Sequence, residues 1–359
     1  MFPPIRKLEP VAREIIGLLN KQPSRFVFED LLGVNNGITM MVREILPNGE
    51  ERKFILKAAA NCTDDSIQKE SAWIQRLQYA AHVSNPITLS DSPLASLEGP
   101  YFLTEYLAHG TLFQFQERTI KANQHIPNRM MWSIFLCLVR GCIAMAYHPP
   151  GPDIQLEQVR DEEPSSLAHN DMHGNNFVFG MLEKTKFISK GGIVYLEHSL
   201  LPPLKLIDFG LATEAGVSVP TDLHRKSLFQ HDISLGLTDY REPIGRRNQG
   251  IDDNILDIGV VMARIVRARP IGLLHEARQW IRNPAIRSDL DPNLRLMIQF
   301  CLAVDPVTRP RLEELNVMIN GGFFNKTADN YGEAGKGDGL ESDETFRRIV
   351  STYILNADT

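Results

Sequence analysis

Hydrophobic residues recur at strand spacing in the first part of the chain. The runs RFVFEDLLG, GITMMVREILP and ERKFILKAAA, between residues 25 and 60, are short and rich in β-branched or aromatic residues, and PNGE forms a turn between the second and third runs. The segment before them, VAREIIGLLN, has apolar positions at helical spacing and is followed by Pro23. The pattern therefore predicts a leading helix and then three strands in a meander.

The next segment, TDDSIQKESAWIQRLQYA, predicts an amphipathic helix, because Ile67, Ile74 and Leu77 recur at helical spacing. Thr63 is its expected N-cap. Glu70 lies on the same apolar stripe, and an unpaired buried carboxylate is too costly, so Glu70 must find a partner. A further apolar strand, within YFLTEYLAHGTLFQF, follows the helix and ends in a connector that contains glycine.

Beyond residue 112 the pattern is mainly helical, in the segments RMMWSIFLCLVRGCIAMAY, NILDIGVVMARIVRA, LLHEARQWIRN and PNLRLMIQFCLAV. The first is the most apolar, yet it has Arg140 near its middle and is short for a membrane span of about 20 residues, so we expect a buried helix. The segment 149–166, rich in proline and acidic residues, predicts a surface loop.

Length and charge indicate how many domains to expect and which partners to exclude. A chain of 359 residues favours about two lobes or domains. Its hydrophobic content of 43% and charged content of 23% are ordinary for a globular protein. A net charge of -6, with a pI of about 6.0, argues against a nucleic-acid partner, which requires a clustered basic surface.

The cysteines and the first residues bear on location. Cys62, Cys137, Cys142 and Cys301 include no CxxC pair, so they suggest neither a zinc site nor a disulfide framework. Reduced thiols fit a cytoplasmic protein. The first ten residues, MFPPIRKLEP, lack the apolar region of a signal peptide, and we expect no membrane partner.

Polar residues in separate stretches of the chain occur in the same order as the catalytic residues of one known protein family. The strand FILK ends at Lys57, Glu70 follows on the predicted helix, HNDMHGNN contains Asp171 and Asn176, and LKLIDFGLA places Asp208 after an apolar run. This order resembles the eukaryotic protein kinase-like family, with its lysine–glutamate pair, its HRDxxxxN loop and its DFG motif.

The resemblance implies an α+β, bilobal protein-kinase-like fold, with a small β-rich N-lobe and a larger helical C-lobe. We expect an N-terminal helical extension over residues 1–23, the N-lobe over 24–107 and the C-lobe over 108–325. The remaining residues, 326–359, are rich in glycine and acidic residues and predict a flexible tail, in which TFRRIVSTYIL forms a short helix.

The resemblance also implies roles for these residues, with ATP and Mg²⁺ as cofactors. Lys57, oriented by Glu70, holds the α- and β-phosphates. Asp208 and Asn176 offer Mg²⁺ the oxygen ligands that it prefers. Asp171 accepts the proton of the attacking hydroxyl group, as a general base or a positioning group.

Further matches concern the nucleotide. TEYLAHGTLF resembles the hinge of the family, with Thr104 as gatekeeper and with Glu105 and Leu107 offering backbone groups to adenine. Phe209 and Gly210 complete the DFG motif, and DPVTRPRLEEL resembles the motif that closes the large lobe. In LLGVNNGITMMV, Gly33 and Gly37 correspond to the phosphate-binding glycine loop, but Asn35 stands where the middle glycine belongs.

The chain also departs from the family pattern. Asn170 replaces the arginine that receives an activation-loop phosphate, so we expect no phosphorylation switch. His173 takes the place of a lysine that contacts the γ-phosphate, and HNDxHxxN is partly similar to aminoglycoside phosphotransferases and choline kinases. Asn254 falls at the register of the buried aspartate that steadies the catalytic loop, and Ile244, after Pro243 and Glu242, replaces the glutamate of the APE motif.

A long insertion separates the two catalytic motifs. MLEKTKFISKGGIVYLEHSLLPP lies between Asp171 and Asp208 and predicts an extended hairpin. The leading interpretation is a protein kinase-like phosphotransferase that transfers the γ-phosphate of ATP to a serine or threonine hydroxyl. Two alternatives stay open at this point: a kinase of small-molecule hydroxyl groups on the same fold, and a nucleotide-binding pseudokinase.

Overall fold

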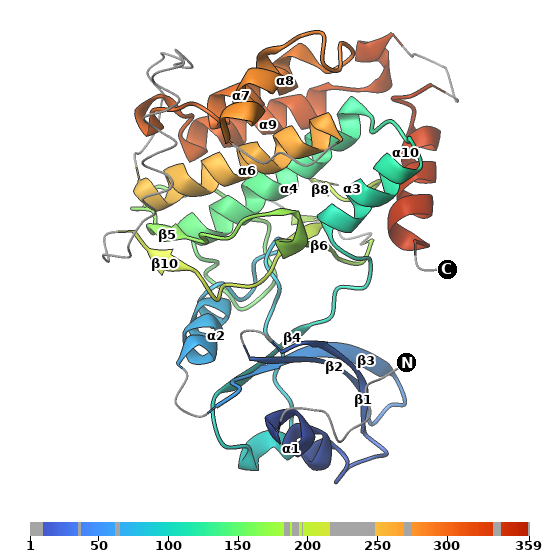
Figure 1. Cartoon of the computed structure of the whole chain (residues 1–359), viewed down its shortest axis with the longest axis vertical. Helices are drawn as coiled ribbons and strands as arrows, with labels where there is room; N and C mark the ends of the chain where they lie inside the picture. The colour runs from blue at the N-terminus through green and yellow to red at the C-terminus, as the bar shows by residue number, and fades with distance from the viewer. Residues whose placement is uncertain are drawn as a thin grey trace. The chain divides into compact units, whose positions relative to one another are not determined.

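The chain forms two compact units with mixed α and β structure. The computed structural model describes residues 10–34, 37–61, 65–182, 187–188, 194–195, 197–215, 248–268, 274–332 and 339–357 (Figure 1). Unit 1 comprises Met1–Tyr79, Ser84–Tyr106 and Asp208–Gly210. Unit 2 comprises Ala80–Val83, Leu107–Ile207 and Leu211–Thr359. Most of the helices belong to unit 2, and the largest sheet belongs to unit 1.

Unit 1 is built on an antiparallel sheet of four strands in chain order. They are β1 (Phe26–Gly33), β2 (Ile38–Ile45), β3 (Glu51–Ala58) and β4 (Tyr101–Glu105). The predicted three-strand meander is confirmed, and β4 is the apolar strand expected after the amphipathic helix. In the register of the sheet, Lys57 on β3 stands opposite Thr39 on one side and Phe102 on the other.

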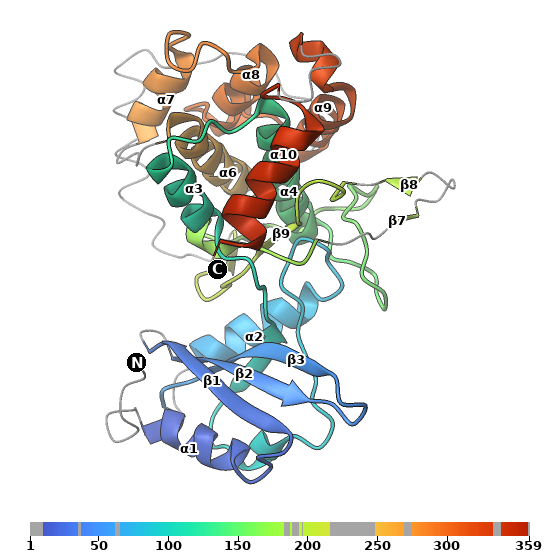
Figure 2. The ribbon, with the colours of Figure 1, turned by 90° about the vertical axis from the view of Figure 1, so that its right-hand side faces the viewer.

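The two faces of this sheet have different neighbours. On one face, helix α1 (Pro10–Leu19) and the 3₁₀ turn η2 (Pro93–Ser96) share a buried apolar core with Phe54, Leu56 and Ala58 of β3 (Figure 2). Side chains alternate along a strand, so Lys57 lies on the face opposite this core. The strand pattern thus removes Lys57 from the apolar interior of unit 1 and directs it to the second face.

Helix α2 (Ser66–Arg76) supplies Glu70, the residue that pairs with Lys57. Its buried residues are Ile67, Glu70 and Ile74, the stripe expected from the sequence. The helix begins later than predicted, with Asp65 at the N-cap position and no hydrogen bond from its side chain. Thr63, the predicted N-cap, lies outside the described residues.

Unit 2 is organised around a long apolar helix, α4 (Asn128–Ala146). Helices α6 (Gln249–Arg267) and α9 (Leu312–Asn325) pack against it, and α8 (Pro292–Cys301) packs against both of these (Figure 1). Helices α3 (Leu112–Lys121), α7 (Leu274–Arg282) and α10 (Asp343–Val350) complete the unit.

Short strands of unit 2 pair in three antiparallel ladders. Strand β5 (Leu167–Ala168) pairs with β10 (Thr213–Glu214), and β6 (Phe177–Phe179) pairs with β9 (Leu204–Leu206). Strand β7 (Phe187–Ile188) pairs with β8 (Val194–Tyr195). This last pair lies within the insertion, where the sequence predicted a hairpin.

Helix α4 is long and apolar enough to cross a membrane, by length and composition alone. However, 94% of its most apolar window is buried inside the structure. Arg140, in the middle of this helix, is also buried and pairs with Glu197 of the insertion. The helix is therefore a core element of unit 2, as the sequence predicted.

The loop 149–166 is not wholly the surface loop that its composition predicted. Glu157 is buried, and its carboxylate accepts hydrogen bonds from the backbone N–H and the Nδ1 of His82, at 2.6 and 2.7 Å. A carboxylate can be buried, even in a polar loop, when charged and polar donors form hydrogen bonds with both of its oxygens.

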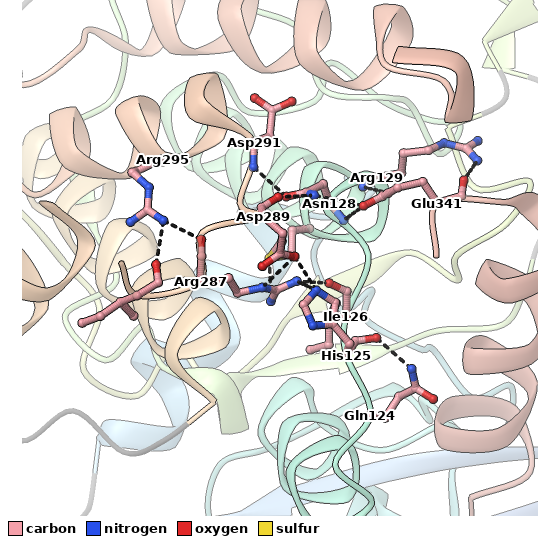
Figure 3. A network of polar contacts seen from close by, with 12 residues as sticks. Gln124, His125, Ile126, Asn128, Arg129, Arg287, Asp289, Asp291, Arg295 and Glu341 are labelled. Carbon is pink, nitrogen blue, oxygen red and sulfur yellow. Dashed lines mark hydrogen bonds and ion pairs between the residues drawn. The ribbon is translucent and has the colours of Figure 1, made fainter. Parts of the chain in front are cut away.

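The described part of the C-terminal segment packs onto unit 2, whereas the sequence predicted a flexible tail. Glu341 accepts hydrogen bonds from the backbone N–H groups of Asn128 and Arg129, where α4 begins, at 2.7 and 3.0 Å (Figure 3). Phe346 and Ile349 of α10 are buried. The predicted short helix, α10, is present. The carboxylate of Glu341 at the N-terminus of α4 and the apolar face of α10 hold this segment in place.

Candidate active site

Lys57, Glu70 and Asp208 meet in unit 1. The ammonium nitrogen Nζ of Lys57 lies 2.7 Å from Oε1 of Glu70 and 3.1 Å from Oδ1 of Asp208. Glu70 comes from α2 and Asp208 from a segment 151 residues beyond Lys57 in the chain. The pairing that the buried position of Glu70 demanded is thus present, and Asp208 makes it a cluster of three charges.

The cluster has one cation and two carboxylates, so negative charge is in excess. Burial by itself lowers the pKa of Lys57, but the charges of Glu70 and Asp208, with hydrogen bonds to both, outweigh it and raise that pKa. Burial is the largest influence on Glu70 and raises its pKa, Asp208 adds to this effect, and Lys57 opposes it. A further positive charge is favoured here, because it would offset the excess carboxylate.

Asp208 is the accessible member of the cluster. Its side chain is 46% exposed, against 5% for that of Glu70. Its backbone has φ of 65°, in the left-handed region that aspartate tolerates better than most residues. Phe209, which follows, is buried, and its backbone N–H hydrogen bonds with Glu70. The DFG turn is thus anchored at Phe209, while the carboxylate of Asp208 is partly exposed.

The glycines near this cluster differ in whether a larger residue could take their place. Gly37 has φ of 114°, and a Cβ atom there would lie 2.7 Å from the carbonyl oxygen of Ala58. A Cβ at Gly33 would meet no atom within 4 Å. Gly210 packs against Asp208 and Glu70. Backbone geometry therefore requires glycine at position 37 and not at 33; Asn35, the departure between them, lies outside the described residues.

The residues of the expected hinge fall on two units. Thr104 and Glu105 end β4 in unit 1, and Leu107 begins a segment of unit 2. The backbone N–H of Glu105 donates to the carbonyl oxygen of Asn85 at 3.0 Å, and its carboxylate accepts from the backbone N–H of Asn85 at 2.8 Å. The Nδ2 of Asn85 also donates to this carboxylate at 3.3 Å, so the end of β4 is held by hydrogen bonds to one residue, and the role in adenine binding stays a prediction.

In unit 2, a rigid frame supports the segment that contains Asp171. His169 is fully buried, its Nε2 lies 3.0 Å from the carbonyl oxygen of Ile207, and its Nδ1 accepts from the backbone N–H of Asp171. Asn254 on α6 accepts from the backbone N–H of His169 at 3.0 Å and donates to Leu167 O at 2.8 Å. Asn254 thus braces the loop at the register where the family has an aspartate, and His169 acts as a structural brace.

Asp171 is held by two neighbours and remains accessible. The amide nitrogen of Asn176 donates to its Oδ2 at 3.0 Å and to its backbone carbonyl at 2.9 Å. His173 Nε2 lies 3.3 Å from its Oδ1. Since His173 Nδ1 accepts from the backbone N–H of Asn175, the ring proton sits on Nε2 and points to Asp171. A positioned, partly exposed carboxylate of this kind can accept a proton from a hydroxyl group.

Asn170 connects this loop to the segment after the DFG turn. Its side-chain nitrogen donates to Leu211 O at 3.0 Å and to Thr213 Oγ1 at 2.9 Å. Its φ of 65° is left-handed, a conformation that asparagine adopts at low cost. Asn170 therefore holds the start of this segment with neutral hydrogen bonds. Residues 242–244, the departure at the APE motif, lie outside the described residues.

The proposed metal ligands fit the chemistry of Mg²⁺ individually. Asn176 uses its amide nitrogen for Asp171, so its Oδ1 faces away from those bonds and, among the described residues, accepts no hydrogen bond. The carboxylate of Asp208 is half exposed and lies in an excess of negative charge. Mg²⁺ prefers such carboxylate and amide oxygens and keeps several waters, so both residues suit it.

Neither a scan against models of known protein families nor a search of curated proteins finds a match to this chain. The case for its function therefore rests on its residues and their geometry.

Sequence reasoning missed a second charged cluster, inside unit 2. Arg140 of α4 pairs through two nitrogens with Glu197, and His82 pairs with Glu157. These residues come from the middle of a helix, an insertion and two connecting segments. The arginine in an otherwise apolar helix was the one available signal, since a buried guanidinium requires a partner.

Proposed function

We propose that the chain is a Mg·ATP-dependent phosphotransferase of the protein kinase-like family, with a bilobal fold and a cytoplasmic location. The observation that carries this proposal is the cluster in unit 1, where Lys57 Nζ lies within 3.1 Å of Glu70 and of the accessible Asp208. Such a charged lysine beside a carboxylate that has room for a cation suits a triphosphate with its metal ion.

Each residue of the proposed mechanism has a physical task. Lys57 keeps its positive charge because two carboxylates outweigh its burial, and it binds phosphate oxygens. Glu70 holds Lys57 in one orientation. Asp208 and Asn176 are the residues that would hold Mg²⁺, and the ion would supply positive charge to the phosphoryl oxygens.

Asp171 performs the proton chemistry of the proposal. Asn176 and His173 fix its carboxylate, so it is oriented before a substrate arrives. It accepts the proton of the attacking serine or threonine hydroxyl, or positions that hydroxyl in line with the γ-phosphate. Because Asn170 secures the following segment without a phosphate, the enzyme is active as synthesised.

A second candidate is a kinase of small-molecule hydroxyl groups. It is favoured by His173, whose ring is partly exposed and whose proton faces Asp171 in place of a lysine side chain. A lysine would reach the γ-phosphate as a point charge, whereas this histidine is tied to the loop. The two candidates share the machinery of phosphoryl transfer and differ in the acceptor.

The test measures ADP release from Mg·ATP by the full chain, first alone, then with a degenerate serine/threonine peptide library, and then with a panel of hydroxylated metabolites. We expect turnover with peptides that Asp171→Asn lowers by at least about 100-fold. Asp153→Asn, an exposed aspartate in the loop 149–166, is the matched control and should keep full activity.

The outcomes separate the candidates. Turnover that requires a metabolite would replace the protein kinase by the small-molecule kinase. Absence of turnover with every acceptor, together with Mg·ATP binding, would leave the pseudokinase. Equal activity of Asp171→Asn and wild type would contradict the proposed role of Asp171 in phosphoryl transfer.

A further inference from the structure

Two histidines and a cysteine converge in the interior of unit 2. His82 lies in the segment Ala80–Val83, Cys137 on α4, and His198 in the turn after β8. All three are buried, with relative exposures of 0%, 1% and 7%. One ligand atom from each lies within 4.8 Å of the others. Three segments that are remote in the chain thus bring a thiol and two imidazoles to one point.

The two imidazoles hydrogen bond to each other and are also close enough to bind one ion. His82 Nε2 and His198 Nε2 are 3.1 Å apart, with the rings tilted by 53°. Two nitrogen ligands of one tetrahedral zinc ion lie about 3.3 Å apart, because each Zn–N bond is about 2.0–2.1 Å. The observed separation is close to this value, so a small outward movement of the rings accommodates an ion.

Glu157 provides the outer support that a histidine ligand requires. Its Oε2 lies 2.7 Å from His82 Nδ1, and its Oε1 accepts from the backbone N–H of His82. A carboxylate on the far nitrogen of a ligating histidine fixes the ring and its tautomer. His82 therefore presents Nε2, its other ring nitrogen, toward His198 and Cys137.

Ligand chemistry favours zinc at this site. Two imidazole nitrogens and a thiolate sulfur suit zinc and copper. Zn²⁺ binds both ligand types in known protein sites, at bond lengths that fit groups as close as these. We propose that His82, Cys137 and His198 bind a zinc ion, with Glu157 as the positioning residue for His82.

The proposed ion has a structural role that does not depend on phosphoryl transfer. Its binding releases to solvent the thiol proton of Cys137 and the proton that lies between His82 Nε2 and His198 Nε2, while His82 Nδ1 keeps its proton for Glu157. The ion then joins the segment of His82, helix α4 and the insertion of His198. Three protein ligands leave the fourth position of the tetrahedron to a water molecule.

The first test uses wild-type full chain, purified on a tag without histidine and dialysed against metal-free buffer. Plasma mass spectrometry should find about one zinc per chain and little copper. Cobalt exchanged into the protein should show the thiolate-to-cobalt charge-transfer band and the visible bands of a tetrahedral ion. Copper in place of zinc, or no metal even after refolding with added zinc, would overturn the proposal.

The second test compares two cysteines on one helix. Cys137→Ala should lose the bound zinc and the charge-transfer band, whereas Cys142→Ala, equally buried on α4, should keep both. Circular dichroism establishes that each variant is folded before metal is measured. Zinc retained at wild-type level in folded Cys137→Ala would contradict the assignment.

A third variant tests the positioning residue. Glu157→Gln keeps the size of the side chain but removes its charge, so zinc affinity should fall about 10- to 100-fold. Competition with a chromophoric chelator measures this affinity and does not depend on enzymatic activity. A purely structural hydrogen bond between His82 and residue 157 would leave the zinc affinity unchanged, and that result would count against the proposal.

Discussion

Two clusters of buried charge, one in each unit, differ in balance and access. In unit 1, Lys57 faces two carboxylates, and the side chain of Asp208 is 46% exposed. In unit 2, Arg140 faces the single carboxylate of Glu197, and their side chains are 7% and 0% exposed. The first cluster has one more carboxylate than cation and is partly exposed. The second is balanced and enclosed.

The difference indicates what each cluster is for. A balanced, enclosed pair stabilises one conformation and loses stability when either member is removed. An unbalanced, accessible cluster is completed by a ligand, so its members affect binding more than folding. Substitutions should therefore separate the two clusters by the property that changes.

The largest effect is expected at Asp208. Asp208→Asn removes the accessible carboxylate, so phosphoryl transfer should fall by at least about 100-fold, because the charge that binds the metal ion is lost. The thermal midpoint should change little, since Lys57 keeps Glu70. Steady-state ADP release and a thermal melt on the same sample check both parts.

Asp65→Asn is the control for this variant. Asp65 is an exposed carboxylate of unit 1, next to α2, and forms an ion pair with exposed Lys69. It should keep wild-type activity. If Asp208→Asn lost much stability but kept its activity per folded molecule, the unit 1 cluster would be a stabilising cluster and not a binding site.

The second effect concerns the unit 2 cluster. Glu197→Gln leaves the Arg140 guanidinium buried without its counter-charge, so the free energy of unfolding should fall by about 3–5 kcal/mol. Urea unfolding followed by circular dichroism measures this change.

Glu162→Gln tests the same substitution where the pair is exposed. Glu162 forms an ion pair with Arg160 at the surface, and its side chain is 54% exposed. Its removal should cost less than about 1 kcal/mol. Equal costs at positions 162 and 197 would show that burial does not set the strength of these pairs.

A backbone comparison in unit 1 is expected to have an intermediate effect. Gly37→Ala places a Cβ near Ala58 O at a left-handed φ, so it should lower the free energy of unfolding by about 1–3 kcal/mol. Gly33→Ala meets open space and should be close to neutral. Urea unfolding of both variants would detect the asymmetry, and its absence would mean that the β1–β2 turn relaxes freely.

A pH-dependent effect is expected at Asp291, a third charged site. Its carboxylate accepts from Tyr331 at 2.7 Å and from the backbone N–H of Asn293 at 2.8 Å, and Lys326 lies at 3.2 Å. Burial by itself raises the pKa of Asp291, but these partners outweigh it and lower that pKa.

The direction of the shift fixes the pH dependence. A carboxyl group with a lowered folded-state pKa contributes stability above its unfolded pKa of about 3.9, and this contribution is lost as the pH falls through the folded value. Asp291→Asn should therefore be less stable than wild type at pH 7, and the difference should shrink on acidification. Urea titrations at several pH values measure it; a difference that grows in acid would contradict the assigned direction.

The sequence predicted features that follow from local pattern. The stripe of α2 was enough to expect that Glu70 is buried and needs a partner, because an unpaired buried carboxylate is costly; that Lys57 is this partner was expected only from the resemblance to the protein kinase-like family. The apolar stretch of α4 was likewise expected to be a core helix. In each case the period of the hydrophobic residues and the cost of burying a charge determined the outcome.

Long-range polar pairing could not be predicted in this way. Glu157 lies in a loop whose composition indicates exposure, and its partner His82 is 75 residues away. Glu341 lies in a segment rich in glycine and acid, yet it binds backbone N–H groups at the start of α4. Such pairs depend on which segments the fold brings together, and no local period encodes that.

Calorimetric titration of the full chain with ATP, with and without Mg²⁺, tests the central claim most directly. We predict Mg²⁺-dependent binding by wild type and by Asp65→Asn, and binding at least about tenfold weaker in Asp208→Asn and in Lys57→Met, because each loses a charge that the Mg·ATP complex requires. Binding of equal strength in all four proteins, or no binding by folded wild type, would contradict the assignment of the Lys57 cluster as a nucleotide site.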